Sequence, residues 1–204
     1  MSKLEWVLSS ILAVLLVIVL ALLLRFWLER NPGPAGEAAE TAQQVVEART
    51  ARTSYQVAQP VAQQWAADAK LLNARAAWPE GDSFEPEAAT WNFVFYSPGQ
   101  SATALISVSQ NEGRLISNRE TDRRLNIYAT TGWQVDSPQL LSIVMENGGR
   151  TFLEQYGEGK LTMTLDTNNQ FVWRARLINT EVPASLTLQV DPNSGEMISS
   201  EESP

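Results

Sequence analysis

The chain has 204 residues, contains neither histidine nor cysteine, and carries a formal net charge of −8 at pH 7. Without these residue types there is no histidine general base, thiol nucleophile, Cys/His zinc site or disulfide bond. Residues 31–204 hold 12 basic and 21 acidic side chains, and this acidic balance predicts no nucleic-acid partner. The sequence also has no glycine-rich phosphate loop or other cofactor pattern, so we expect no cofactor.

Residues 1–30 are predicted to form a membrane anchor. Residues 7–24 contain no charged side chain, and Trp6 and Trp27 flank them. These tryptophans lie 21 helical steps apart, about 31 Å, which matches a hydrocarbon core of ~30 Å. A cleaved signal peptide is the alternative, but its apolar region is shorter. We expect a single-pass protein of the cytoplasmic membrane that contacts lipid through residues 6–27 and has an extracytoplasmic C-terminal body.

Residues 31–59 are predicted to form a linker. Pro32, Gly33 and Pro34 cannot continue a helix, so the anchor ends there. The following residues, 37–57, are rich in Ala, Gln, Glu and Arg, which favours a partly helical stalk. Sustained apolar heptad positions are missing from this stalk, so we do not expect it to dimerise as a coiled coil.

The first folded unit is predicted over residues 60–118. Pro60 suits the first turn of a helix running to about residue 77, because apolar residues then recur at helical spacing. These residues are Trp65, Ala69, Leu72 and Ala76. Three strands separated by turns are expected to follow, at residues 91–96, 104–108 and 114–117.

The second folded unit is predicted over residues 119–204. Asp136 or Ser137 caps a helix with Pro138 in its first turn, and the glycines at 148–149 end it. Four strands are expected after the helix, at residues 160–165, 171–178, 185–190 and 196–199. The predicted fold class is therefore α+β: an anchor and stalk, then two repeated units of one helix packed on an antiparallel sheet.

An internal match supports this repeat. Residues 91–117 and residues 173–199 are equal in length and align without a gap. The anchors of the repeat are predicted to be Trp65, Trp91, Trp133, Trp173, Gly113 and Gly195. The interval between the paired tryptophans is shorter in the first unit, from 65 to 91, than in the second, from 133 to 173. We therefore expect that the first unit has lost or shortened its opening strand and exposes a sheet edge near residues 101–108.

The end of the second unit resembles the closing hairpin of PepSY-type domains. In that hairpin a Val-Asp pair, a short turn and a Gly-Glu pair precede an apolar strand, as in residues 190–198 (VDPNSGEMI). The preceding helix and the strand with Trp173 fit the same plan. The first copy departs from it, with Ser109 in place of Asp and Arg114 in place of Glu. The resemblance implies a cystatin-like helix-on-sheet fold and an extracytoplasmic, non-enzymatic role in restraining peptidases or attaching to envelope proteins. It carries over no catalytic residue.

Two segments are candidate calcium sites: the first is an acidic loop, and the second faintly resembles a calcium loop. They comprise Glu80, Asp82, Glu85 and Glu87 in one segment and Asp191, Asn193 and Gly195 in the other. The second segment lacks the third acidic ligand and the distal Glu of a calcium loop, and turn formation accounts for the residue types in both segments. We interpret both as solvated turns and assign no metal ligand.

Catalysis is not expected. Asp68 and Asp136 occupy matching positions upstream of the two repeats, but no nucleophile or oxyanion donor accompanies them. Trp91 and Trp173 could form an aromatic ligand surface, although their equivalence favours core packing with each indole N–H bonded to a carbonyl.

The leading functional hypothesis is a membrane-anchored, non-enzymatic module that binds a protein or peptide partner, with restraint of a peptidase as one form of that role. Binding would occur by addition of a partner strand to the predicted edge. That edge comprises Thr103, Ala104, Leu105, Ile106, Ser107 and Val108. The alternative is a structural accessory subunit of a larger membrane complex. A third reading is a small-ligand carrier or enzyme, which a deep pocket with convergent polar groups would favour.

Overall fold

A computed structural model describes residues 50–88 and 90–203 of the chain. All of them belong to one compact unit that spans Val45–Pro204. The predicted anchor and the linker up to residue 49 lie outside the described residues. Within the described part of the chain, no helix is long and apolar enough to cross a membrane.

The body is built on one antiparallel sheet of eight strands in the order β4-β3-β2-β1-β5-β6-β7-β8. The strands are β1 (Lys70–Ala77), β2 (Thr90–Ser97), β3 (Ala102–Ser109), β4 (Glu112–Glu120), β5 (Lys160–Asp166), β6 (Val172–Ile178), β7 (Ser185–Val190) and β8 (Met197–Ser203). Each run of four consecutive strands forms a meander, and the β1–β5 pair joins the two runs into one sheet. The predicted α+β class is confirmed.

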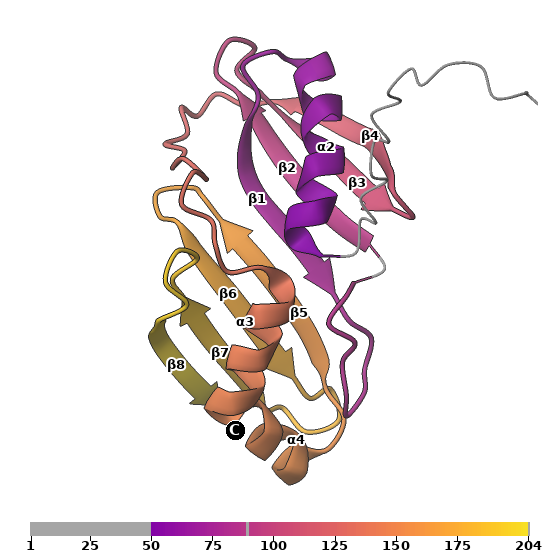
Figure 1. Cartoon of the computed structure of the whole chain (residues 1–204), viewed down its shortest axis with the longest axis vertical. Helices are drawn as coiled ribbons and strands as arrows, with labels where there is room; N and C mark the ends of the chain where they lie inside the picture. Colours follow the sequence, from indigo (N-terminus) through magenta and orange to yellow (C-terminus); the bar gives the residue numbers. More distant parts are fainter. Residues whose placement is uncertain (1–49, 89, 204) are drawn as a thin grey trace, which may run out of the picture. The chain divides into compact units, whose positions relative to one another are not determined.

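The helices lie on one face of this sheet (Figure 1). Helix α2 (Ala51–Trp65) precedes the first four strands and packs on β2, β3 and β4. Helices α3 (Ser137–Val144) and α4 (Arg150–Tyr156) precede the second four, and α3 packs on β6. The backbone leaves helical geometry at Asn147 and Gly148, so the predicted helix stop at residues 148–149 is a kink before α4.

The helix predicted over residues 60–77 is wrong. Helix α2 ends at Trp65, and Lys70–Ala77 form strand β1. Pro60 lies inside α2, and residues 51–59, which we predicted to be linker, belong to that helix. The error has a physical source: β1 has the sequence KLLNARAA, which is rich in helix formers. A register shift between Leu71 and Asn73 also breaks the alternation expected of a strand.

Large aromatic rings meet over small residues at the centre of the sheet. Trp91 on β2 and Trp173 on β6 are fully buried, as predicted, and their ring centroids lie 6.3 Å apart. Two strands, β1 and β5, separate them. Beside the two indoles, β1 presents Ala74 and Ala76 to the core, while its third buried residue, Leu71, lies further along the strand. Their small side chains leave the volume that the two indoles fill.

The indole N–H groups near this junction share one acceptor. Trp173 Nε1 and Trp133 Nε1 each donate to the backbone carbonyl of Val135, at 2.8 Å. The rings of Trp133 and Trp173 are also in edge-to-face contact, with centroids 5.9 Å apart. The expected loop carbonyl for Trp173 is therefore confirmed, and the segment before α3 is fixed against the core.

The N-termini of α2 and α3 meet at Asp136. Its Oδ1 accepts from the backbone N–H of Ser137, at 2.7 Å, and from that of Arg52 in α2, at 3.0 Å. Ser137 Oγ accepts from the N–H of Ala51 at 3.0 Å. The predicted cap of α3 is thus confirmed, and the same two residues also cap the helix of the other half.

Removing the indole ring of Trp173 from the centre of the sheet should destabilise the fold strongly. Trp173→Ala is expected to lower the free energy of unfolding by about 3–5 kcal/mol, because it leaves a cavity in the core. Trp65→Ala removes the same side chain from a half-buried site at the end of α2, and should cost less than half as much. Urea unfolding followed by circular dichroism measures both, and equal losses would contradict the proposed packing.

The shared cap gives a second stability test. Asp136→Ala should lower the free energy of unfolding by about 1–3 kcal/mol, because both helices lose an N-terminal acceptor. Asp136→Asn keeps an acceptor oxygen and should lose less than half of that. Asp122→Ala, in an exposed loop, is the control and should stay within about 0.5 kcal/mol of the wild type. Equal effects of Ala and Asn at position 136 would show that the carboxylate is not acting as a cap.

Candidate functional site

The sheet edge predicted at Thr103–Val108 is wrong. Strand β3 pairs with β2 along one side and with β4 along the other. Ala104, Ile106 and Val108 are buried against the helices, while Thr103, Leu105 and Ser107 alternate onto the opposite face. The first half does not lack its opening strand, because β1 fills that role, and the nine-residue β4 covers the outer side of β3.

Strand β4 is the actual edge of the first half. Among the described residues it pairs only with β3. Leu115 and Ile116 are 43% and 56% exposed, which is high for apolar side chains in a strand. Gly113 sets the approach of α2 to this edge, since a Cβ there would lie 3.2 Å from the carbonyl oxygen of Val57. This close approach explains the glycine that we predicted as a repeat anchor.

A hollow lies at each end of β4. One has a volume of about 240 Å³ and is lined by Ser107, Ser109, Gln110, Glu112, Arg114 and Ile116. The other has a volume of about 510 Å³ and is lined by Gln100, Ser101, Glu120, Thr121 and Asp122. An unpaired edge supplies backbone donors and acceptors, and neighbouring hollows can receive side chains of an added strand.

An ion pair borders the first hollow. Arg114 Nη2 donates to Glu112 Oε2 at 2.6 Å, on the surface. This hydrogen bond and the arginine charge lower the pKa of Glu112, and the same contact raises the pKa of Arg114. Both groups are therefore charged at neutral pH, and the pair fixes one wall of the hollow.

Strand β8 forms the other edge of the sheet. Among the described residues it pairs only with β7, and Met197 and Ile198 are 47% and 58% exposed. The charged residues of β8 are Glu201 and Glu202, so this edge is acidic, whereas β4 carries both positive and negative side chains. Gly195, another predicted repeat anchor, has φ +79° in the turn before β8, a conformation that favours glycine.

The structure keeps Asp68 and Asp136 apart. Asp136 bonds the N-terminus of α2, and Asp68 follows the C-terminal end of this 15-residue helix. The length of the helix, about 22 Å, therefore separates the two regions. Asp68 accepts from Ser97 Oγ at 2.5 Å and from the Gly99 N–H at 2.6 Å. Each carboxylate thus has a local role, and the two do not form an acid–base pair.

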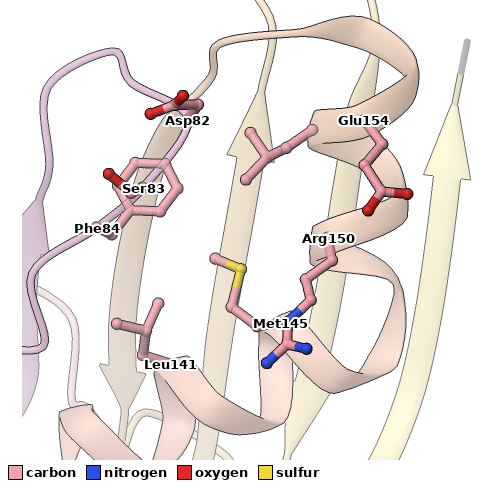
Figure 2. A pocket seen from close by; sticks show the side chains of 8 residues that line it. Asp82, Ser83, Phe84, Leu141, Met145, Arg150 and Glu154 are labelled. Carbon is pink, nitrogen blue, oxygen red and sulfur yellow. The ribbon is translucent and has the colours of Figure 1, made fainter.

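A groove separate from both edges lies between the loop after β1 and the helices of the second half. Figure 2 shows Phe84 and Asp82 on the loop facing Leu141, Met145 and Arg150. The groove has a volume of about 490 Å³, with Leu153 and Glu154 completing the helical wall. Its floor is apolar, its rim carries exposed charges of both signs, and Ser83 is its single hydroxyl. This arrangement can hold an apolar group but does not assemble a nucleophile with an activating base.

The predicted acidic turns have structural roles. Glu80 accepts from Thr180 Oγ1 at 2.5 Å and lies 3.9 Å from Lys160 Nζ. Asp191 Oδ1 accepts from the Asn193 N–H at 2.7 Å, which closes the turn between β7 and β8. Across residues 50–88 and 90–203, no group of three acidic side chains is placed to hold a metal ion.

Comparisons with known proteins do not identify a family. No family model matches the chain, and no curated protein matches it. Among solved structures, the crystal structure of a "putative lipoprotein" from Clostridium difficile 630 is similar. The alignment covers 73% of this chain and 92% of that chain, at 13% sequence identity and a TM-score of 0.47. A likeness of this size carries no argument about function, so the site is interpreted from its own geometry.

The contacts of Asp68 predict a pH effect. Hydrogen bonds from Ser97 and Gly99 lower the pKa of Asp68 below its ordinary value. Because the folded-state pKa is depressed, the contribution to stability is present above about pH 3.9 and is lost as the pH falls through the lower folded-state pKa. Ser97→Ala should raise the pKa of Asp68 in a ¹³C NMR titration. Ser109→Ala, an exposed control, should leave this titration unchanged, and no change with Ser97→Ala would contradict the assignment.

Proposed function

We propose that this protein is a non-enzymatic interaction module, and that a strand of a protein or peptide partner adds to the β4 edge. The observation that carries the proposal is the nine-residue β4 strand, unpaired along its outer side within the described residues. Natural sheets usually protect such edges, because exposed backbone groups pair with other chains. Leu115 and Ile116, together with the hollows at both ends, supply the side-chain contacts that give strand addition its specificity.

The two halves of the sheet are proposed to be copies of one unit. Trp91 pairs with Val108 between β2 and β3, and the matching Trp173 pairs with Val190 between β6 and β7. All four residues are fully buried, and the last strand pair of each half has a register shift. Trp65 and Trp133 do not support the repeat, since Trp65 ends α2 whereas Trp133 precedes α3. A four-stranded meander following a helix is consistent with the helix-on-sheet fold that the PepSY resemblance implies, and restraint of a peptidase is the form of the role that this resemblance suggests.

The module is proposed to act at the outer face of the cytoplasmic membrane. The uncharged run at residues 7–24, with its flanking tryptophans, supports a single-pass anchor. An anchor on the same chain confines the β4 edge to a layer near the bilayer. A partner in the same membrane or at its surface would then meet the edge at a high effective concentration.

Ile116→Lys tests the proposed edge. The change places a charge on the exposed side of β4 and should reduce co-purification of the partner from native membranes at least tenfold, with the fold intact. Ile198→Lys is the matched control, because residues 116 and 198 both lie at the register shift in the last strand pair of their half. Tagged full-length protein in mild detergent, followed by quantitative mass spectrometry, provides the measurement. Equal partner recovery with the two variants would refute use of the β4 edge.

The structural accessory subunit is the competing proposal, and the apolar run at residues 7–24 favours it as a helix-docking element. Replacing residues 6–27 with an unrelated membrane anchor of equal length separates the two proposals. An interaction module should keep its partner after this exchange, whereas a subunit held through its membrane helix should lose it. The same purification reads out both results, with immunoblotting of membranes to control for correct insertion.

A further inference from the structure

A row of polar side chains runs across the sheet on the face opposite the helices. The strand registers place one residue of each strand in this row. In sheet order these are Arg114, Ser107, Asn92, Arg75, Thr164, Arg174, Gln189 and Ser199. Their side chains point away from the core, because their neighbours Ala74, Ala76, Trp173 and Ala175 are buried against the helices. No apolar residue interrupts the row, so this face presents a continuous polar strip.

Three arginines form a basic cluster at the centre of the strip. Arg75 lies on β1, and Arg174 and Arg176 lie on β6, with β5 between them. Thr164 of β5 faces both Arg75 and Arg174, and Thr162 faces Arg176. Arg75 and Arg176 are exposed and Arg174 is half-buried. The cluster therefore consists of accessible guanidinium groups set among threonine hydroxyls.

None of these three arginines forms an ion pair or a side-chain hydrogen bond with another described residue. The acidic residue on the same face of β5 is Asp166, and its Oδ1 instead accepts from the Asn168 N–H at 2.8 Å. Residues 31–204 hold 21 acidic side chains, so partners of opposite charge are abundant in the chain. An unpaired cluster of three positive charges on an acidic protein points to a ligand that brings its own negative charge.

The spacing of the cluster fits an extended acidic peptide. Arg174 and Arg176 are two residues apart on one strand, which separates their Cα atoms by about 6.8 Å. Carboxylates at alternate positions of an extended peptide recur at the same interval of about 6.8 Å. Arg75, two strands away, lies about 10 Å to the side. Guanidinium groups bind carboxylates through paired N–H donors, and the threonines add hydroxyl donors between them.

We propose that the cluster of Arg75, Arg174 and Arg176 binds an acidic segment of the protein partner, in which carboxylates occupy alternate positions of an extended chain. This inference rests on the proposed interaction function and names the chemistry of its partner. The cluster and the outer side of β4 are separate surfaces: β2 and β3 lie between Arg75 and the edge strand. Each surface can therefore be removed without the other.

The test uses the full-length chain in non-ionic detergent and a fluorescent (Glu-Ser)₅ peptide, with (Gln-Ser)₅ as the uncharged control peptide. Wild-type protein should bind (Glu-Ser)₅, and binding should weaken as NaCl rises from about 50 to about 300 mM. The triple variant Arg75→Gln, Arg174→Gln, Arg176→Gln should bind at least about tenfold more weakly. The matched control is Arg52→Gln, Arg123→Gln, Arg124→Gln, which removes the same charge at exposed positions outside the strands and should bind like the wild type.

Equal loss of binding in the two triple variants would overturn the proposal, because net charge and not the cluster would then govern binding. Failure of wild-type protein to bind (Glu-Ser)₅ would also overturn it. A third arm of the test measures binding to vesicles of equimolar phosphatidylglycerol and phosphatidylcholine. If the protein binds these vesicles through the arginine cluster but does not bind the peptide, the proposed acidic peptide is wrong and the ligand is an anionic lipid surface. Strand addition at β4 is tested separately with the Ile116→Lys variant, in which the arginine cluster is intact. Failure of one proposal therefore does not contradict the other.

Discussion

The fold depends on one packing constraint at the centre of the sheet. Trp91 and Trp173 approach from strands on either side of the β1–β5 pair, and their rings meet at a centroid distance of 6.3 Å. This contact is possible because β1 presents Ala74 and Ala76 to the core. A larger residue at either alanine would separate the rings or displace the helices. The two four-stranded halves therefore share one core, with the edge strands β4 and β8 at opposite ends of the sheet.

The sheet of the described body has one face covered by helices and one face without them. The helices bury the apolar side chains on one face of the sheet. Among the described residues, the opposite face and the two edge strands are the surfaces of the sheet that can contact other molecules. Backbone groups along β4 can form hydrogen bonds with any extended chain, and they carry little sequence preference. Charged side chains on the face opposite the helices can select among partners through the sign and spacing of their charges. In the proposed interaction module the two kinds of contact would be complementary, since strand addition would supply affinity and the arginine cluster would discriminate among partners.

Much of the sheet was predictable from sequence, because its strands alternate buried and exposed residues between recognisable turns. Strands β2, β3, β5, β6 and β7 lie within a few residues of their predicted positions, and Asp136 was correctly predicted as a cap. The first helix and β1 were not predictable, since the alanines that β1 needs to admit two tryptophans are also strong helix formers. The edge was misplaced for the same reason: once β1 was assigned to a helix, the first half was left one strand short. The arginine cluster required the strand registers, which bring residues 75 and 174 together from opposite halves of the sheet.

The double cap at Asp136 has a consequence for the order in which the chain acquires its structure. Helix α2 begins at Ala51, yet two of its terminal N–H groups bond to side chains 84 and 86 positions later. Strand β1 has β2 on one side, and the hydrogen bonds on its other side are made by β5, which starts at Lys160. Until the second half is synthesised, a growing chain emerging from the ribosome would therefore hold α2 with only its local cap at Thr50, and β1 with one side open. During that interval β1 can pair with a wrong strand of the same or another chain. Synthesis of the segment from β5 to β8 ends this interval, because these strands complete the sheet.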